Sequence, residues 1–570
     1  MDSRTLLALV LSIAVLIGFQ FFFGGDVSQP PREETGVENV PATGVSEQAS
    51  DHEYGERIRT DGDAAVSSLS SIRSPDIPVD TKAPLRKARD ITVETDLYQL
   101  VFSERGGTVK KYLLKHYLTT LSDDAPPVNL IDVSSLHLPL GLQMESQPPV
   151  DLSSQFFEPD KENLKLTQAG EEAQLKFTCN MSNGIKITRA YTFHQGSYWI
   201  DLSIYLSGAG TIPSTLCLYN KPGKGGSGLS GLTYSKFTFT GPSYYAKNEL
   251  HEIKLDDIGE KHAYTGPVDW MGYGNDYFMT ALIPIVSEGP WNVLIEKKEA
   301  DGLTESRLTA LKPSPKGAGQ GVEVLNLGVY FGPKDIDRLN ALGHNLSKAI
   351  NFGWFDPIAK PLLYFLKFLY RYIHNYGLAI IIVTILIKIA FWPLAQKSAK
   401  SMKTMQKLQP KMAKLKEKYG KDKERMNKEL MQLYKTYKVN PMGGCLPMLL
   451  QIPVFFALYK VLLQSIEVRH APFMLWINDL SAPDRLMIPG VNIPYLGGIP
   501  VLTLLMGLSM FLQQKLSPSS LDPMQARMMQ FLPVIFTCMF INFPSGLVLY
   551  WLINNVLTIA QQHYVNKFTD

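Results

Sequence analysis

The sequence predicts a mixed fold, in which a polytopic α-helical membrane domain follows a large antiparallel β-sandwich. Long apolar runs lie at the N-terminus and in the C-terminal third, where aromatic residues also concentrate. Between them, residues 91 to about 335 alternate apolar and polar side chains at period 2, as strands with one buried face do. The chain has 570 residues, which is more than one ordinary core accommodates, so at least two domains are expected.

Residues 5–23 form an uncharged apolar run that is long enough to span a bilayer. A secretory signal peptide is the alternative, but its apolar region is normally shorter and precedes a small-residue cleavage site. This run ends in three Phe and two Gly. We therefore expect an uncleaved transmembrane anchor within residues 1–25.

Residues 26–90 are rich in Pro, Ser, Gly and acidic residues, and Tyr54 is their only aromatic residue. Such a segment buries too little apolar surface to offset its ordering entropy, so we expect a flexible tether. Residues 91–350 are then the β-sandwich domain, and the pattern of residues 335–350 predicts a closing helix. Cys179 and Cys217 lie in this domain, and the sequence leaves open whether they form a disulfide or stay separate thiols.

Residues 357–377 carry cations at roughly helical spacing among Leu, Phe and Tyr, which predicts an amphipathic helix in the membrane interface. The alternative is the first half of one very long spanning helix. The chain beyond it, residues 378–570, is predicted to be the membrane domain. Together with the N-terminal anchor it gives six spans, and the five in this domain are expected at 378–396, 443–465, 495–515, 527–542 and 546–563.

The segment between the first two of these five spans, residues 397–438, holds 14 Lys/Arg and 4 Asp/Glu. Loops this basic stay in the cytoplasm, so the β-domain is expected in the periplasm and both termini in the cytoplasm. Met and Leu recur at three- and four-residue intervals, which predicts a cytoplasmic helical hairpin. Its charge is compatible with a solvated linker, or with contact to ribosomal RNA or anionic lipid, and charge alone does not choose among them.

Lys388 stands near the middle of the span 378–396. An intramembrane cation is costly and marks a functional site by default. Lys388 lies roughly 12 Å from the cytoplasmic boundary, beyond the reach of its own stem. No Asp or Glu occupies the middle of another expected span, so we predict a hydrated cavity. Thr384 and Trp392 share its helix face at spacings of four.

Other expected spans contribute polar and aromatic side chains that the same cavity requires: Gln451, Gln513, Gln514, Asn554 and Asn555, with Tyr550 and Trp551. Any one of the amides is explained equally well by an interhelical hydrogen bond worth about 1 kcal/mol. The cation itself fits two functions. It binds a translocating anion in a solute or ion transporter, or it receives the hydrophilic part of a polypeptide entering the bilayer. No inverted repeat of the kind common in transporters is visible.

No motif indicates an enzyme, a cofactor or a metal. The one G-x-G-x-x-G match, Gly223–Gly228, is flanked by β-type sequence rather than by a strand and a helix, so we interpret it as a surface loop. The His residues show no metal-ligand spacing.

Four stretches carry a family resemblance: "NPMGGCLPMLLQIPVFFALY", "APFMLWINDLSAPD", "DPMQARMMQFLPVIFT" and "FPSGLVLYWLINN". From about residue 357 onward the chain resembles the Oxa/YidC family of membrane protein insertases. The resemblance implies an energy-independent insertase and folding chaperone of the bacterial inner membrane. It would handle nascent membrane proteins and lipids, alone or beside the Sec translocon, and would bind no DNA.

The resemblance also implies a five-helix core around a groove open to cytoplasm and lipid. The last core helix would touch substrate at Tyr550 and Trp551, and the hairpin 397–438 would be mobile and required. The periplasmic domain would be a β-supersandwich. The groove cation is typically Arg in this family, whereas Lys388 keeps the charge without the bidentate fork. The tail "NKFTD" is short, so we expect ribosome contact through the basic hairpin rather than the tail.

Overall fold

The computed structural model describes residues 87–122, 124–131, 137–145, 149–182, 184–208, 214–221, 238–254, 261–285, 290–298, 303–311, 322–419, 422–437, 446–488, 490, 496–516 and 523–568. The chain divides into two compact units, 1–71 and 72–570, and every described residue belongs to the second. The predicted anchor, the tether up to residue 86 and the Gly223–Gly228 loop lie outside the described residues.

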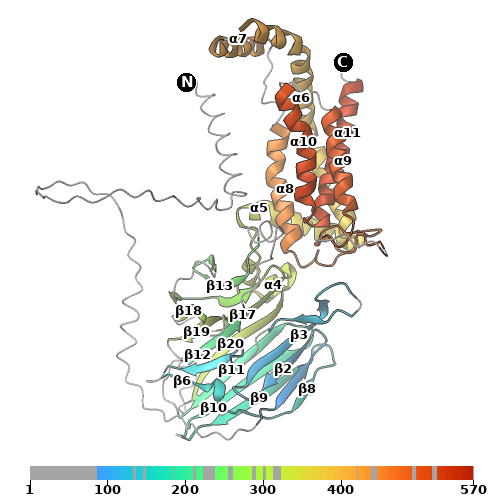
Figure 1. Cartoon of the computed structure of the whole chain (residues 1–570). Helices are drawn as coiled ribbons and strands as arrows, with labels where there is room; N and C mark the ends of the chain where they lie inside the picture. The colour runs from blue at the N-terminus through green and yellow to red at the C-terminus, as the bar shows by residue number, and fades with distance from the viewer. Residues whose placement is uncertain are drawn as a thin grey trace, which may run out of the picture. The chain divides into compact units, whose positions relative to one another are not determined.

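The β-rich region contains three sheets (Figure 1). The five-stranded sheet has the order β4 (Pro127–Asn129), β3 (Thr108–Leu118), β2 (Tyr98–Ser103), β1 (Asp90–Glu94), β8 (Asn163–Lys165). The nine-stranded sheet has the order β14 (Glu249–Glu252), β13 (Gly241–Ala246), β16 (Trp270–Gly274), β17 (Phe278–Pro284), β20 (Val322–Pro333), β11 (Trp199–Ser207), β10 (Lys186–His194), β9 (Glu172–Asn180), β7 (Glu158–Pro159). The six-stranded sheet has the order β15 (Lys261–Gly266), β18 (Trp291–Lys298), β19 (Leu303–Ala310), β12 (Ser214–Asn220), β5 (Gly141–Met144), β6 (Val150–Asp151).

Strand burial follows the period-2 pattern that the sequence shows. In β11, Ile200, Leu202 and Ile204 are buried while the residues between them are partly exposed or exposed. The inward faces of the sheets join one hydrophobic core. The prediction of an antiparallel sandwich needs one correction, because β1 pairs with β8 in parallel.

The predicted helix 335–350 is wrong in length. Helix α4 covers only Ile336–Leu342, and a 3-10 turn follows at Leu346–Ala349. Three consecutive residues, Gly343, His344 and Asn345, have positive φ angles between these elements. A left-handed stretch ends an α-helix, and Gly at this position makes the break inexpensive.

Helix α5 covers Asp356–Ile373 and is separate from α6, which begins at Tyr376. His374 lies between them with φ 56°, so the alternative of a single long helix is wrong. Three cations predicted for α5, Lys360, Lys367 and Arg371, lie on this helix. The side chain of Asn375 then caps α6, because its Oδ1 accepts the Leu378 N–H at 3.0 Å.

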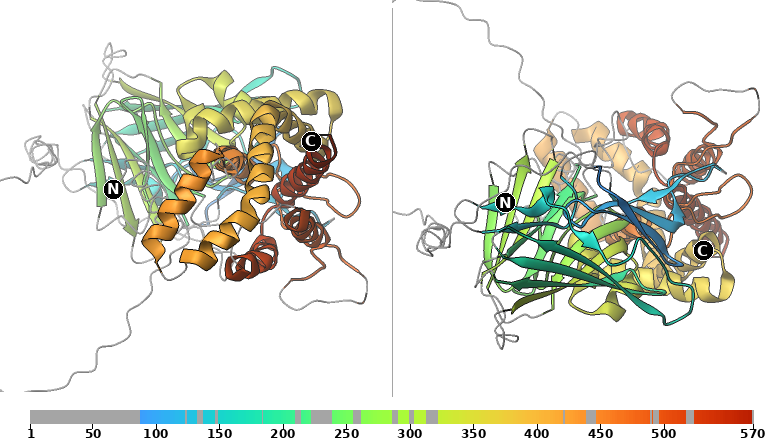
Figure 2. Two further views of the ribbon diagram at one scale, coloured as in Figure 1. Left: turned by 90° about the horizontal axis from the view of Figure 1, so that it is seen from above. Right: turned by 90° about the horizontal axis from the view of Figure 1, so that it is seen from below.

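The remaining helices are α6 (Tyr376–Tyr419), α7 (Lys423–Thr436), α8 (Leu446–Gln464), α9 (Val501–Leu516), α10 (Pro523–Phe540) and α11 (Ser545–Phe568). Figure 1 shows α8–α11 side by side, and Figure 2 shows the last helices, in red, along their axes. The first arm of the predicted hairpin is a direct continuation of the first spanning helix, since α6 runs unbroken for 44 residues. Met405, Leu408 and Met412 on α6 are buried in a small cluster against Leu430 and Leu433 of α7.

By length and composition, Tyr376–Ser398 is the segment of the described chain that qualifies as a full membrane span, with mean hydropathy 2.4. Shorter apolar helices cover Leu450–Gln464, Val501–Leu516 and Phe531–Phe540. The predicted start at residue 495 is wrong, because α9 begins at Val501 after Pro500. The count of six spans remains a prediction.

The thiols of Cys179 and Cys217 are free and buried, so they form no disulfide. They lie on β9 and β12, which belong to different sheets. Cys538 is exposed on α10.

Candidate functional site

Helix α11 carries a stripe of polar residues that faces two other helices. Tyr550, Asn554 and Thr558 recur at spacings of four, which places them above one another on one face of the helix. This face meets α6 at Lys388 and α8 at Gln451. We call these five residues the polar track.

Lys388 is half-buried, and its Nζ donates a 2.7 Å hydrogen bond to Thr558 Oγ1. Thr558 in turn donates to the Asn554 carbonyl oxygen at 2.6 Å, one turn earlier on α11. Among the described residues, no carboxylate lies within ion-pair distance of Lys388. An ammonium has three donors, so Thr558 satisfies one of them and leaves two for water or another ligand.

Gln451 of α8 bonds to two residues of the same stripe that lie one turn apart on α11. Its Nε2 donates to Asn554 Oδ1 at 2.7 Å and to Tyr550 Oη at 3.0 Å. Tyr550 is buried, whereas Gln451 and Asn554 are partly exposed. Three helices are therefore joined by hydrogen bonds that meet at Asn554, whose backbone oxygen accepts from Thr558 and whose side-chain oxygen accepts from Gln451.

The other predicted site residues lie in different surroundings. Thr384 is buried, and its hydroxyl donates to the Ile380 carbonyl oxygen at 2.7 Å. This hydrogen bond of Thr384 therefore lies within α6. Trp392 is 37% exposed, and its ring centroid lies 6.1 Å from that of Tyr564 on α11.

Trp551 and Gln513 lie on α11 and α9. Trp551 packs its ring against Phe455 of α8 and Phe540 of α10, with centroids 4.9 Å and 5.0 Å away. Gln513 is half-buried on α9. Of the predicted site residues, the bonds of the polar track join Lys388, Gln451, Tyr550 and Asn554.

Thr558 is the member of the polar track that sequence reasoning missed. The sequence contained a signal for Thr558, because this residue lies one turn beyond Asn554 on the helix face that begins at Tyr550. A second polar contact ties the buried Asn555 to Ser509 of α9, with Asn555 Nδ2 donating at 2.9 Å. This contact fits the interhelical hydrogen bond that the sequence offered as an explanation for such amides.

The opposite ends of the helices are held by two charged residues of the loop between α8 and α9. Asp484 accepts hydrogen bonds from the Leu502 N–H at 2.5 Å and the Thr503 N–H at 3.3 Å, and so caps α9. Arg485 donates to the Ile541 carbonyl oxygen and to Asn542 Oδ1, both at 2.9 Å, just beyond α10. This network binds the starts and ends of helices together at the end remote from the hairpin α6–α7.

Two family models together cover nearly all of the described chain. The model described as "YidC periplasmic domain" matches residues 90–365, and the one described as "60Kd inner membrane protein" matches residues 368–570. The membrane protein insertase YidC of Syntrophus aciditrophicus is 43% identical over the full length of both chains. That of Geobacter metallireducens is 40% identical over all of this chain and 98% of the relative.

The chain belongs to the YidC family of membrane protein insertases. It is accordingly an inner-membrane protein with a periplasmic domain, which is the β-rich region. A crystal structure of an active YidC insertase is similar with a TM-score of 0.37 and 19% identity, covering 85% of this chain and 94% of the other. A galactose mutarotase related enzyme from Lactobacillus acidophilus is similar with a TM-score of 0.26 and 11% identity, covering 42% of this chain and 97% of the other.

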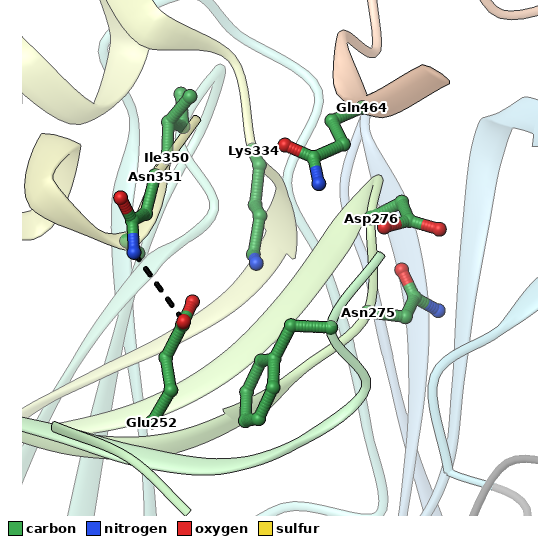
Figure 3. Close-up of a pocket in the computed structure, with 9 residues that line it drawn as sticks. Glu252, Asn275, Asp276, Lys334, Ile350, Asn351 and Gln464 are labelled. Carbon is green, nitrogen blue, oxygen red and sulfur yellow. Dashed lines mark hydrogen bonds between the residues drawn. The ribbon is translucent and has the colours of Figure 1, made fainter. Parts of the chain in front are cut away.

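The YidC periplasmic domain contributes most of a second polar site, a hollow open to solvent (Figure 3). Its lining includes Glu252, Asp276, Lys334 and Asn351, with Gln464 from the end of α8. Asn351 Nδ2 donates to Glu252 at 3.3 Å. Burial raises the pKa of Asp276 to about 7, although Lys334 opposes the shift, and burial lowers the pKa of Lys334. Among the described residues, Asp276 Oδ1 has no hydrogen-bond partner.

Proposed function

We propose that this YidC protein inserts its substrates along the polar track, with Lys388 attracting the hydrophilic segment of a nascent membrane protein. Insertion of membrane proteins is the activity of the family to which the chain belongs. The observation that supports the route is the row of hydrogen-bonded polar groups from Lys388 past Thr558 and Asn554 to Gln451 and Tyr550.

The physical problem of insertion is the polar backbone and any acidic side chain of the translocated segment. Each unsatisfied backbone group costs several kcal/mol in hydrocarbon. A row of hydroxyl and amide groups offers replacement hydrogen bonds during passage, and a half-buried ammonium attracts carboxylates. The exposed apolar side chains of α9, such as Leu504, Leu508 and Phe511, would let a hydrophobic segment move into lipid.

We further propose that Thr384, Trp392, Gln513 and Trp551 line the same route. The contacts of two of them support a more peripheral part, since Thr384 bonds to its own helix and Trp551 packs among aromatic rings. Lys388 acts as a point charge here, because an ammonium lacks the planar fork that recognises a carboxylate at two atoms. Solute transport, the alternative raised by the sequence, has no support among the relatives.

For the topology we propose six spans, with an anchor in residues 1–25, a tether over 26–90 and both termini in the cytoplasm. The basic hairpin 397–438 then lies in the cytoplasm. Its exposed cations, among them Lys411, Lys418 and Lys435, suit contact with the ribosome. A folding-chaperone role and cooperation with the Sec translocon belong to the same proposal.

The central test replaces Lys388 in proteoliposomes and follows insertion of two reporter substrates, with and without acidic residues in the translocated segment. We expect Lys388→Glu to reduce insertion of the acidic reporter at least about tenfold and the neutral reporter much less. Lys388→Arg is the matched control that keeps the charge. Equal loss for both reporters, or no loss, would remove the charge from the mechanism.

A second test places a photo-crosslinking amino acid at Trp551 or Thr558 and stalls a nascent chain during insertion. Crosslinks from both positions to the hydrophilic segment support the route. Crosslinks from Trp551 alone would confine the route to the aromatic side of α11.

A further inference from the structure

The loop between α8 and α9 presents an apolar tip formed by the turn Met474–Ile477. The Ile477 N–H donates to the Met474 carbonyl oxygen at 3.1 Å, and the Phe473 N–H donates to the Ile477 carbonyl oxygen at 2.9 Å. Leu475 stands at the tip with 81% of its surface exposed, and Met474 beside it is 46% exposed. The turn is closed by hydrogen bonds, so this exposure is a property of an ordered element.

Leu475 also adopts a backbone conformation that favours glycine. Its φ is 58°, at the second position of a turn in which positive φ normally selects Gly. A Leu at this position accepts backbone strain and buries almost none of its side chain. Packing inside the described part of the chain therefore does not account for an apolar side chain at this position.

The base of the turn is clamped to the point where α6 begins its apolar stretch. The side chain of Asn375 caps α6 and also donates through Nδ2 to the Phe473 carbonyl oxygen at 2.8 Å. The ring of Phe473 lies against Gly377, where any Cβ would collide with it. The apolar segment of α6 runs from Tyr376, and its first exposed apolar residue is Leu378.

These contacts fix the depth of the tip. Leu475 is two residues from Phe473, which spans at most about 7 Å. The polar interface on each side of a bilayer is of a similar thickness, about 5–7 Å. Residues 471–478 contain no charged side chain, and Trp476 donates its indole N–H to Asp484 at 2.6 Å while its ring stays half-buried. A tryptophan with one polar contact is typical of the membrane interface.

We propose that the turn Met474–Ile477 inserts Leu475 and Met474 into the periplasmic leaflet of the membrane, at the boundary of headgroups and acyl chains. The periplasmic side follows from the periplasmic domain that precedes α5 and α6. The proposal rests on the membrane crossing of α6 and is independent of the polar track. It gives the α8–α9 loop a lipid contact that fixes the height of the helix ends held by Asp484 and Arg485.

The test uses the full chain in vesicles of phosphatidylethanolamine and phosphatidylglycerol at about 3:1. Cys445 and Cys538 are replaced by Ala, and Cys179 and Cys217 are kept because their thiols are buried. One introduced cysteine is labelled with an environment-sensitive fluorophore at Leu475→Cys or, separately, at Met474→Cys. Tyr205→Cys on the exposed side of β11 is the water-facing control, and Ile389→Cys in the apolar stretch of α6 is the lipid-facing control.

We expect blue-shifted emission at both turn positions, with stronger quenching by a shallow lipid-attached quencher than by a deep one or by aqueous iodide. Water-like emission with iodide quenching at the turn would overturn the proposal. If the lipid-attached quencher still quenches Ile389→Cys, the crossing of α6 stands. Blue-shifted emission without lipid quenching would also overturn it, because protein would then cover the tip. Water-like emission at Ile389→Cys would overturn the crossing of α6 as well.

Discussion

Arg189 in the periplasmic domain and Lys388 in the helical domain are both cations removed from bulk water, yet they are held differently. Arg189 is fully buried, and its guanidinium donates to the carbonyl oxygens of Gly106 at 2.5 Å and Leu140 at 2.6 Å. Lys388 keeps partial exposure and donates to one hydroxyl. Neither has a carboxylate within ion-pair distance in the described chain.

The difference separates a cation that holds a fold from one that is available to a ligand. The planar fork of Arg189 reaches two segments that are distant in sequence, and the neighbouring Tyr191 hydroxyl donates to the Gly107 carbonyl oxygen at 3.0 Å. Burial lowers the pKa of Arg189 and so disfavours its charge. The charge is tolerated because the guanidinium donates hydrogen bonds to those two carbonyl oxygens. Lys388 has two donors left and is partly exposed, as binding of a ligand requires.

The largest effect is expected from Arg189→Met. It leaves two buried carbonyl groups without donors, so the free energy of unfolding of the periplasmic domain should fall by about 2–4 kcal/mol. Thermal unfolding of the full chain in detergent, followed by tryptophan fluorescence, measures it. Lys186→Met is the matched control, because Lys186 is an exposed cation on the same strand, β10. A loss as small as that of the control would make Arg189 as dispensable to the fold as we expect Lys388 to be.

A buried charge of the opposite sign, Asp276, should show its effect through pH. Its folded-state pKa of about 7 lies above the ordinary value of 3.8, so its stabilising protonation is complete below the ordinary value and is lost as pH rises through 7. Asp276→Asn should therefore raise the unfolding temperature at pH 8 and change it little at pH 4. The exposed Glu249→Gln is the control. An equal shift at both pH values would show that the side chain, rather than its ionisation, is responsible.

Lys388→Met tests the other half of the comparison. It should lower insertion of a substrate with an acidic translocated segment about tenfold while leaving thermal stability unchanged or higher, because an uncompensated charge has been removed. Parallel insertion and unfolding measurements on one preparation check this. A large loss of stability would place Lys388 in the same class as Arg189.

Thr558→Val should have the smallest effect. It removes the acceptor of Lys388 with little change of shape, and interhelical hydrogen bonds in membranes average about 0.6 kcal/mol. Insertion should stay close to that of the parent, since water or substrate replaces the hydroxyl. Gln451→Leu, which breaks contacts with both Tyr550 and Asn554, is the stronger companion. A Thr558 variant as impaired as Lys388→Met would mean that Thr558 positions the ammonium for its task.

The sequence by itself determined the order of a β-rich region and a helical region, and it named most members of the polar track. Alternation at period 2 marks strands such as β11, because one face of a strand must be buried, and long apolar runs with a basic segment mark helices such as α6. The cost of a cation in hydrocarbon singled out Lys388, and uncharged spans singled out Gln451, Tyr550 and Asn554.

Only the tertiary structure decided which polar groups meet. The bond from Lys388 to Thr558 joins residues 170 positions apart, and the side-chain rotamer of Thr384 decides whether its hydroxyl meets a neighbouring helix or its own backbone. Local signals also misjudged the helix after Asp335, where three left-handed residues end α4. The exposure of Leu475 is likewise decided by the tertiary structure. A side chain's surroundings depend on what packs beside it, and the periodicity of one segment carries no information about that.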